Sequence, residues 1–327
     1  MNQIKNIGVL TSGGDSPGMN AAIRAVVKTG LNNNLKVFGI YDGFKGMIEN
    51  RIRELNFSSV NNIIQIGGTI LGTARCEQFK TKEGRLLAFQ NLQKHFIDAL
   101  IVIGGDGSFA GAHQFSLEHK ISVIGIPGTI DNDIEGTDFS IGFDTCLNTV
   151  IEAVDKIRDT ASSHHRVFFI EVMGRASGQI ALNSAIACGA ESVLIPETIT
   201  DIQTLAQEIK TQNKGTRSSI IIVAEGDDEG GAKEILNKVK PFLPEYDLRF
   251  SVLGHIQRGG NPSAFDRILA TKFGVKAVDL ILNNKSSLMV GQIGSEIISK
   301  EFVQKTTDSG KELSGIKDML KLLLTKY

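Results

Sequence analysis

The sequence predicts an α/β protein built from two doubly wound, largely parallel sheets. Apolar, β-branched runs that end in turns of glycine with aspartate, as at Ala99–Ile103 and Ile121–Ile126, are typical of buried parallel strands. Segments with apolar residues at helical spacing, such as 144–162, separate such runs. The chain has 327 residues, which suits two domains at the usual ~100–200 residues each.

The expected elements alternate along the chain, as repeated βα units require. Strands are expected at Ile4–Leu10, Lys36–Tyr41, Ala99–Ile103, Ile121–Ile126, Val167–Val172, Ser192–Ile195, Ile220–Ala224 and Arg249–Leu253. Helices are expected at Ala21–Leu31, Leu86–His95, Asp144–Ser162, Gln179–Cys188, Ile202–Thr211, Ala264–Leu282 and Ile316–Thr325. Residues 49–62 are interpreted as an irregular, polar section. We expect ligands at the carboxyl ends of the strands, in a cleft between the two domains.

The composition argues against several classes of partner. The net charge of -1 and the pI of about 6.6 give no general electrostatic attraction to nucleic acid or to an anionic membrane. The three cysteines form no C-x-x-C pair and indicate reduced thiols of a cytoplasmic protein. Neither a signal peptide nor a span of about 18 uncharged apolar residues is visible. We therefore expect a cytoplasmic protein without a nucleic-acid or membrane partner.

Three glycine turns carry the chemistry. The first, SGGDSPG at 12–18, lies between a strand and a helix, where backbone N–H groups and a helix N-terminus can face an anion. The second, GGDGS at 104–108, lets a phosphate approach the backbone, and Asp106 can hold a divalent cation on it. The third, PGTIDND at 127–133, supplies Asp131 and Asp133. A metal-holding acid beside a second acid provides what phosphoryl transfer needs.

Seven motifs occur in the order in which 6-phosphofructokinases carry their equivalents. They are TSGGDSPGMNAAIR, GGTILGTAR, IGGDGS, PGTIDND, SSHHR, EVMGRASG and GHIQRGG. Over almost the whole chain, the sequence resembles the bacterial ATP-dependent members of that family. The resemblance implies a homotetramer of subunits with two Rossmann-like domains. Residues 1–141 and 257–306 are then the nucleotide-binding domain, and residues 142–256 and 307–327 the sugar-phosphate domain.

The implied reaction converts fructose 6-phosphate and ATP to fructose 1,6-bisphosphate and ADP, a step of glycolysis, with Mg²⁺ as cofactor. On the nucleotide side, Asp106 would hold Mg²⁺, Gly14 would present its N–H to the phosphates, and Arg75 would neutralise charge on the transferring group. The expected nucleotide contacts are Gly14, Arg75, Cys76, Gly105, Asp106, Gly107 and Ser108.

On the sugar side, the resemblance makes Asp131 the general base for the sugar 1-hydroxyl. Thr129, Arg75 and Arg175 complete the expected catalytic set, and Asp133 would support the metal region. The expected substrate contacts are Thr129, Ile130, Asp131, Arg166, Met173, Gly174, Arg175, Glu225, Arg249, His255 and Arg258. In the family, the arginines that match Arg166 and Arg249 reach across from a neighbouring subunit. Either a strand end or a helix start could aim His255 and Arg258 at one dianion.

Simpler interpretations exist for single residues. Taken alone, TIDND is a common turn sequence, Arg75 or Arg249 could be ordinary surface arginines, and His164 and His165 could cap or pack. A glycine-rich dehydrogenase does not fit, because the first turn lacks G-x-G-x-x-G with a following ribose-binding acid. A non-catalytic nucleotide-binding regulator remains an alternative, although Asp106, Asp131 and Asp133 are all present.

Two glycines bear on the phosphoryl donor. Pyrophosphate-using relatives have aspartate and lysine where this chain has Gly107 and Gly128. A side chain at the first position would block the α-phosphate and the ribose, so we predict ATP. A pyrophosphate-dependent enzyme is the alternative.

The expected effector site departs from the family pattern. Its residues are Arg24, Lys28, Arg158, Gly189, Glu191 and Lys214, with Glu191 as the Mg²⁺ ligand of a bound ADP. Lys28 replaces the usual arginine, Phe57 replaces an expected arginine, and Thr216 replaces a lysine. Each charge-assisted bond lost is worth about 1.5–3 kcal/mol. We expect activation by ADP and inhibition by phosphoenolpyruvate to be weak or absent.

Overall fold

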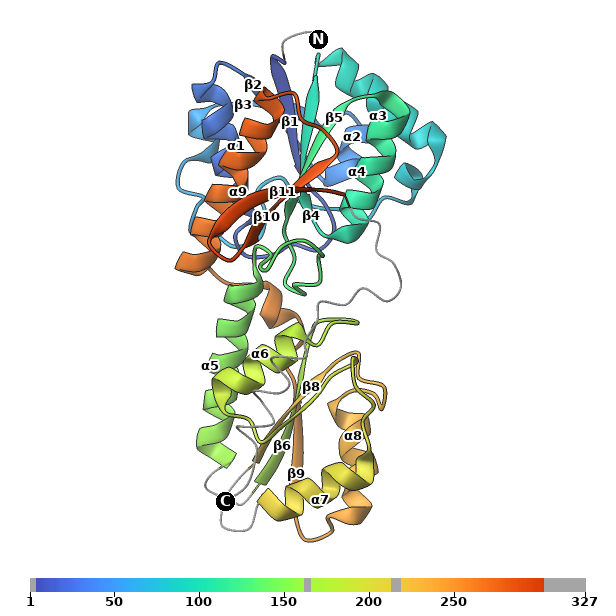
Figure 1. Cartoon of the computed structure of the whole chain (residues 1–327), viewed down its shortest axis with the longest axis vertical. Coiled ribbons are helices and arrows are strands. Elements are labelled where there is room, and N and C mark those ends of the chain that lie inside the picture. Colours follow the sequence, from blue (N-terminus) through green and yellow to red (C-terminus); the bar gives the residue numbers. More distant parts are fainter. Residues whose placement is uncertain (1–3, 162–165, 213–218, 303–327) are drawn as a thin grey trace. The chain divides into compact units, whose positions relative to one another are not determined.

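The computed structural model describes residues 4–161, 166–212 and 219–302, which form a mixed α/β protein (Figure 1). Two compact units are present. Unit 1 comprises residues 4–129, 134–145 and 258–302, and unit 2 comprises residues 130–133 and the described part of 146–257. The predicted fold class is confirmed. The predictions for His164, His165, Lys214, Thr216 and the helix at 316–325 lie outside the described residues.

Unit 1 contains a seven-stranded sheet in the order β11-β10-β5-β4-β1-β2-β3. Its strands are β1 (Asn6–Thr11), β2 (Lys36–Ile40), β3 (Ile52–Leu55), β4 (Ala99–Gly104), β5 (Ser122–Pro127), β10 (Leu288–Ile293) and β11 (Glu296–Glu301). The five strands from β10 to β2 pair in parallel, whereas the edge strands β3 and β11 are antiparallel. The carboxyl ends of β1, β4 and β5 therefore meet at one edge of the sheet.

Helices cover both faces of this sheet, as Figure 1 shows. They are α1 (Met19–Asn32), α2 (Gly43–Ile48), α3 (Lys82–Lys94), α4 (Asp106–His119) and α9 (Ala264–Leu282). Alternate residues of these strands belong to two separate hydrophobic cores, one on each face of the sheet. Ile101 and Ile103 pack with side chains of α1 and α9, whereas Leu100 and Val102 pack with side chains of α2, α3 and α4. This alternation explains why the strands are apolar throughout.

Unit 2 contains a four-stranded parallel sheet in the order β7-β8-β6-β9. Its strands are β6 (Arg166–Val172), β7 (Ser192–Leu194), β8 (Ser219–Ala224) and β9 (Asp247–Val252). Its helices are most of α5 (Phe143–Ala161), with α6 (Gln179–Cys188), α7 (Ile202–Gln212) and α8 (Ala232–Val239). Within the unit, α5 and α6 lie on one side of the sheet and α7 and α8 on the other (Figure 1). Side chains of α7 and α8 pack against Phe169 and Ile221.

One part of the sequence-based prediction is wrong. Residues 49–62 are not irregular throughout, because they contain the edge strand β3 and the short helix η1 (Phe57–Val60). Only Ile52 and Leu55 of β3 are buried, and the charged Arg53 and Glu54 between them are exposed. Charged residues are common on edge strands because they discourage pairing with other chains. The same residues hide the strand from a search for apolar runs.

Several further elements were not predicted. They are α2, α4, α8 and the hairpin of β10 and β11, whose turn has Gly294 at φ +57°. The helix expected at Leu86–His95 begins one turn earlier, at Lys82, and is α3. Its N-cap is Thr81, whose Oγ1 accepts the Gly84 N–H. Among the helices in the described part of the chain, none combines the length and apolarity needed to cross a membrane.

Candidate active site

The turns after β1 and β4 lie against each other in unit 1. A Cβ on Gly104 would lie 2.5 Å from the Ser12 carbonyl oxygen, and Gly13 has φ +88°. A side chain at either position is therefore excluded or strained. The approach leaves backbone N–H groups of two turns at one sheet edge, which is a suitable arrangement for phosphate.

The predicted nucleotide residues of the second turn occupy the start of α4. Gly105 is the residue before the helix, Asp106 is its first residue, and Ser108 is buried in its first turn. A helix N-terminus favours negative charge, so phosphate groups are stabilised at this position. Gly107 is exposed, and a Cβ there would meet no atom within 4 Å. The space that the ATP prediction requires at Gly107 is therefore present within unit 1.

Gly128, by contrast, does not face open space. A Cβ at this position would lie 3.2 Å from Ile103 Cγ2 and 3.3 Å from Met19 Cε. Core packing therefore favours glycine at position 128, independently of any effect on the phosphoryl donor. Of the two glycines, Gly107 is the informative one.

The glycine-rich segment 66–75 is joined to the first turn by hydroxyl groups. Thr73 Oγ1 donates to the Gly13 carbonyl over 2.7 Å, and Thr11 Oγ1 donates to the Gly72 carbonyl over 2.8 Å. These bonds place Arg75, which is exposed, and Cys76, which precedes the short helix η2 (Glu77–Lys80), next to the turn after β1. The sequence analysis missed both threonines, because a threonine in a turn carries no distinctive signal.

The Arg258 side chain packs against the turn 12–18, which follows β1. Its guanidinium occupies the space beside Gly14, where a Cβ would be 2.0 Å from Nη1. Arg258 Nη1 also donates to the Asp15 carbonyl over 3.5 Å. His255 and Arg258 were expected either at a strand end or at a helix start. Residues Gly254–Arg258 form the 3-10 helix η4, so both residues lie on a short helix. His255 is exposed and belongs to unit 2, so its joint action with Arg258 stays a prediction.

Asp131 and Arg175 meet in unit 2. The Asp131 side chain is only 6% exposed, and its Oδ2 lies 3.8 Å from Arg175 Nε. Ser177 Oγ donates to the Asp131 carbonyl over 3.1 Å and so fixes the backbone of the predicted base. Thr129 belongs to unit 1, where its carbonyl accepts Ser140 Oγ over 2.7 Å.

The turn that carries Arg175 is shaped by Glu225 and Gly226. Arg175 has φ +53°, and its N–H donates to Glu225 Oε1 over 2.9 Å. A Cβ on Gly226 would lie 1.9 Å from the Arg175 carbonyl oxygen, so this close approach requires glycine. The structure thus brings together three predicted site residues, Asp131, Arg175 and Glu225.

Gln257 is a buried residue of this region that the sequence analysis missed. Its Oε1 accepts the Met173 N–H over 3.1 Å, and its Nε2 donates to the Gly254 carbonyl over 3.0 Å. The amide therefore connects the GHIQR segment to the predicted substrate residues Met173 and Gly174, the latter at φ +139°. The sequence signal that could have identified Gln257 is its position inside the motif GHIQRGG.

Arg166 and Arg249 converge on Asp247, a residue that the sequence analysis did not single out. Arg166 Nε lies 2.9 Å from Asp247 Oδ2, and Arg249 Nε lies 2.8 Å from Oδ1. The hydrogen bond from Arg166 lowers the pKa of the Asp247 carboxyl, with a smaller effect from Arg249. The two cations are thereby held side by side.

These two arginines are separated along the strands of unit 2 from the predicted sugar residues Met173, Gly174 and Arg175. Arg166 is the first residue of β6 and pairs in register with Asp247, the first residue of β9. Met173, Gly174 and Arg175 follow the carboxyl end of β6. A strand of this length spans about 20 Å at ~3.3 Å per residue. Arg166 therefore lies at the opposite end of β6 from Met173, and Arg249, opposite Phe168, lies two residues in from the same end as Arg166.

The predicted effector residues of unit 2 are close together. Arg158 Nη2 donates to the carbonyls of Cys188 and Gly189 over 2.9 and 3.0 Å, and Nη1 lies 3.4 Å from Glu191 Oε1. Glu191 Oε2 accepts the Ile220 N–H over 2.6 Å. In unit 1, Arg24 and Lys28 are one turn apart on α1 and half-buried, while Phe57 is exposed.

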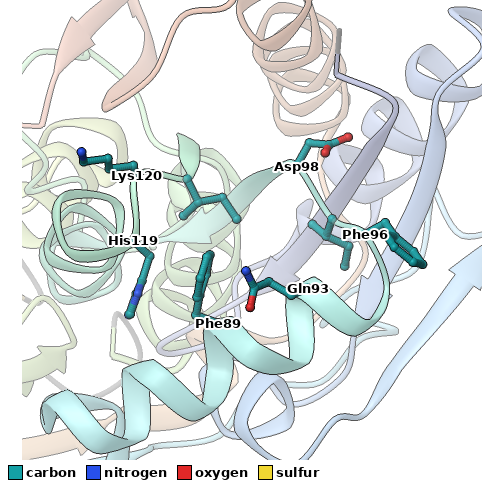
Figure 2. A pocket seen from close by; sticks show the side chains of 8 residues that line it. Phe89, Gln93, Phe96, Asp98, His119 and Lys120 are labelled. Carbon is teal, nitrogen blue, oxygen red and sulfur yellow. The ribbon is translucent and has the colours of Figure 1, made fainter. Parts of the chain in front are cut away.

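A shallow pocket of about 370 Å³ lies elsewhere on unit 1 (Figure 2). Its lining residues are Phe89, Gln93, Phe96, Ile97, Asp98, His119, Lys120 and Ile121. Phe89 and His119 stack with ring centroids 4.5 Å apart. Asp98 and Ile121 directly precede β4 and β5, so the pocket is at the amino ends of these strands. It is therefore at the opposite edge of the sheet from the phosphate turns.

Asp106 is the predicted magnesium ligand. The described residues contain no group of three His, Cys, Asp or Glu side chains arranged to hold a metal ion. Mg²⁺ in phosphoryl-transfer enzymes usually takes one or two carboxylates, with substrate phosphates and waters as its other ligands. One half-buried carboxylate at a helix N-terminus fits that ligand set.

Comparison with known proteins gives a consistent result. Residues 6–281 match the family model described as phosphofructokinase. ATP-dependent 6-phosphofructokinase 2 of Bacteroides thetaiotaomicron is 53% identical over 303 residues, which are 92% of this chain and 93% of the relative. ATP-dependent 6-phosphofructokinase of Thermoanaerobacter sp. is 51% identical over 322 residues, 95% of this chain and 100% of the relative.

Solved structures agree with this similarity. The phosphofructokinase of Saccharomyces cerevisiae matches with a TM-score of 0.87 and 36% identity over 98% of this chain, which spans about half (47%) of the yeast chain. A pyrophosphate-dependent phosphofructokinase of Marinobacter aquaeolei matches with a TM-score of 0.85 and 22% identity, over 99% of this chain and 92% of that one. At that identity, the second match shows the shared fold alone.

Proposed function

The chain belongs to the phosphofructokinase family, and from this we propose that it transfers the γ-phosphoryl group of ATP to the 1-hydroxyl of fructose 6-phosphate. A bond forms between the sugar O1 and the γ-phosphorus, and the bond from that phosphorus to the β–γ bridging oxygen breaks. The hydroxyl proton passes to Asp131. The products are fructose 1,6-bisphosphate and ADP, as in glycolysis.

The surroundings of Asp131 are the observation that supports this mechanism most strongly. General base catalysis needs a carboxylate held in a fixed place, within hydrogen-bond reach of the hydroxyl that it deprotonates. Asp131 meets the first condition, because Ser177 holds its backbone and Arg175 lies 3.8 Å from its side chain. The Arg175 side chain is two-thirds exposed, so its guanidinium is available to an anionic substrate.

The nucleotide phosphates are proposed to bind the turns after β1 and β4 and the N-terminus of α4. Arg75 would neutralise charge on the transferring group, a contribution that often dominates catalysis of phosphoryl transfer. Asp106 would hold Mg²⁺, which supplies further charge neutralisation at the terminal phosphates when it is bound.

The donor is proposed to be ATP rather than pyrophosphate. The most similar relatives named above are ATP-dependent enzymes. Gly107, where a pyrophosphate-using enzyme is expected to have aspartate, is exposed and has open space beside its Cα. The retained acids Asp106 and Asp131 favour an enzyme over a non-catalytic regulator.

The active site is proposed to be completed by a neighbouring subunit in a homotetramer. Arg166 is the first residue of β6, and Arg249 lies two residues into β9, opposite Phe168, whereas Met173 and Arg175 follow the carboxyl end of β6. This separation along the strands supports the proposal that another copy supplies both arginines to the sugar-phosphate site. Mixing an inactive Arg249→Ala variant with an inactive Asp131→Asn variant should then restore activity in hybrid tetramers, whereas a site within one subunit would show no restoration.

Regulation by ADP and by phosphoenolpyruvate is proposed to be weak. Arg158 and Glu191 already bind each other and backbone groups, and Phe57 and Lys28 of unit 1 stand where arginines are expected. Sigmoidal dependence of rate on fructose 6-phosphate that ADP relieves strongly would contradict this proposal.

We also place the enzyme in the cytoplasm, where glycolysis takes place. Its cysteines Cys76, Cys146 and Cys188, all in the described part of the chain, form no disulfide bond, which is usual for a reducing compartment.

A coupled assay tests the proposed function directly. The purified chain would be supplied with fructose 6-phosphate and Mg²⁺, with ATP or with pyrophosphate as donor, and ADP or phosphate release would be followed. We expect turnover with ATP and none above background with pyrophosphate. A preference for pyrophosphate, or ATP binding without turnover, would contradict the proposal.

A further inference from the structure

The carboxamide of Asn20 makes three hydrogen bonds to a single loop. Asn20 is the second residue of α1 and is 1% exposed. Its Nδ2 donates to the Ile66 carbonyl over 3.0 Å and to the Gly67 carbonyl over 3.2 Å, and its Oδ1 accepts the Ile70 N–H over 2.7 Å. Both amide protons are used, so one side chain holds the start of the segment 66–75 at three points.

Other contacts hold the middle and the carboxyl half of this loop: the Asp42 N–H donates to the Leu71 carbonyl over 2.7 Å, and the Thr11 and Thr69 hydroxyls lie 2.9 Å apart. The loop contains no helix or strand, and Gly68 and Gly72 have φ +65° and +67°. Because glycine is the most flexible residue, a loop with two such positions needs external contacts to stay ordered. Thr11 and Thr73 hold its carboxyl half, as described above, and Asn20 holds its amino half.

The same amide fixes two further parts of unit 1 relative to each other. Asn20 lies two positions after the phosphate turn 12–18, on the helix that follows this turn. Gly67 packs so closely on Gly260 that a Cβ would lie 2.2 Å from its carbonyl oxygen. The loop held by Asn20 is therefore packed between the first turn of α1 and the segment after Arg258.

We propose that Asn20 is a positioning residue, which fixes the loop 66–75 so that Arg75 faces the transferring phosphoryl group. This inference rests on the proposed function. Asn20 itself is buried and acts through the loop, and displacement of a catalytic group by about 1 Å can lower a rate by about 100-fold.

The variant Asn20→Asp tests the proposal with little change in volume. It removes both donors and places a negative charge beside the Ile66 and Gly67 carbonyl oxygens. We expect kcat to fall by about 30-fold with the KM for fructose 6-phosphate changed by less than about 2-fold, since only the nucleotide side is disturbed.

Asn91 provides a matched control in the same unit. Its buried Nδ2 donates to the carbonyls of Met47 and Ile48 over 3.1 and 2.7 Å, and its Oδ1 accepts Lys94 Nζ over 2.9 Å. Asn91→Asp thus makes the same chemical change between α3 and the end of α2. We expect a similar loss of melting temperature in both variants, with kcat of Asn91→Asp within about 2-fold of the wild type.

A double-mutant cycle with Arg75 distinguishes positioning from a general effect. If Asn20 acts through Arg75, then Asn20→Asp should lower kcat by less than about 3-fold in an Arg75→Ala background. A reduction of about 30-fold in that background as well would overturn the proposal. If Arg75→Ala alone had normal activity, the role of Arg75 in the proposed function would fail instead.

Asn20→Ser, which introduces no charge, replaces the aspartate variant in the cycle if the latter does not fold. If both variants of Asn20 fail to fold while Asn91→Asp folds, Asn20 serves stability, and the positioning role is overturned. Equal loss of kcat in Asn91→Asp and Asn20→Asp would also overturn it.

Discussion

The phosphate turns of unit 1 differ in construction from the arginine cluster of unit 2, which consists of Arg166, Asp247 and Arg249. In unit 1, the turns after β1 and β4 present backbone groups and pack so closely that a Cβ on Gly104 would lie 2.5 Å from the Ser12 carbonyl oxygen. In unit 2, the charge lies on side chains, with Arg166 and Arg249 held on Asp247. One region depends on the path of the backbone, and the other on ion pairs between half-exposed groups.

This difference determines how each region should respond to change. The backbone N–H groups of these turns carry no charge to titrate or to screen, so glycine variants of the turns act through shape or through a newly introduced charge. Ion pairs near the surface contribute up to about 1 kcal/mol and weaken as salt is added. We therefore expect large effects at the turns and at the base, and graded, salt-dependent effects at the arginine cluster.

The largest effect is expected for Asp131→Asn. Asparagine keeps the volume but cannot accept the proton of the sugar hydroxyl, so kcat should fall by about 1000-fold, within the range measured for general bases. Calorimetric titration should show ATP binding unchanged, because the nucleotide turns belong to unit 1. Glu152→Gln, on an exposed pair with Lys156, is the control. A loss of kcat smaller than about 10-fold would contradict the role of Asp131.

The next effect concerns the nucleotide turn. Gly107→Asp places a carboxylate where phosphate is expected, and a repulsion of about 2–3 kcal/mol corresponds to a loss of about 100-fold in kcat/KM for ATP. The melting temperature should hardly change, because a Cβ at Gly107 meets no atom within 4 Å. Gly128→Ala should show the opposite pattern, since its Cβ presses on Ile103 and Met19. Unchanged use of ATP by Gly107→Asp would place the nucleotide elsewhere.

The same distinction explains what the sequence could predict. The phosphate turns were predictable, because their glycines follow strands directly and local chemistry requires them. The parallel sheets were predictable from apolar runs such as Ala99–Ile103, which are buried on both faces. Local patterns of this kind need no knowledge of distant contacts.

Contacts between distant segments could not be predicted. Asp247 lies 81 positions from Arg166, and Asn20 lies 46 positions from Ile66. Nothing in the neighbourhood of either residue in the sequence indicates its partner. The strand β3 was missed for another reason, since the charges on Arg53 and Glu54 suit an exposed edge and mask its apolar residues.

A third prediction uses the buried carboxyl of Asp266, which holds the start of α5. Asp266 is fully buried, and its oxygens accept the N–H groups of Gly142 and Thr145 over 2.9 and 2.8 Å. Burial raises the pKa of this carboxyl from 3.8 to about 6, against the smaller opposing effect of its hydrogen bonds. The folded protein thus binds a proton that the unfolded chain releases near pH 4.

The sign of the pH dependence follows from this difference. Between pH 4 and pH 6 the folded state holds more protons, so Asp266 makes the free energy of unfolding fall as the pH rises, by about 3 kcal/mol in all. Asp266→Asn cannot titrate, so urea unfolding at several pH values should show wild type losing its stability relative to the variant over this range. Parallel profiles for the two proteins would show that Asp266 has an ordinary pKa.

The smallest effect is expected at the arginine cluster. Asp247→Asn removes the charge that holds Arg166 and Arg249 side by side, while the amide oxygen can still accept a hydrogen bond. The KM for fructose 6-phosphate should rise by about 3- to 5-fold with kcat unchanged, in keeping with up to about 1 kcal/mol for half-exposed ion pairs. Because salt screens such ion pairs, the difference in KM between Asp247→Asn and the wild type should shrink at about 0.5 M salt. A loss of activity in a variant of Gly104 or Gly128, which would act through packing, should not depend on salt. A salt-independent loss of kcat in Asp247→Asn would mean that the cluster, like the turns, acts by fixing the path of the backbone.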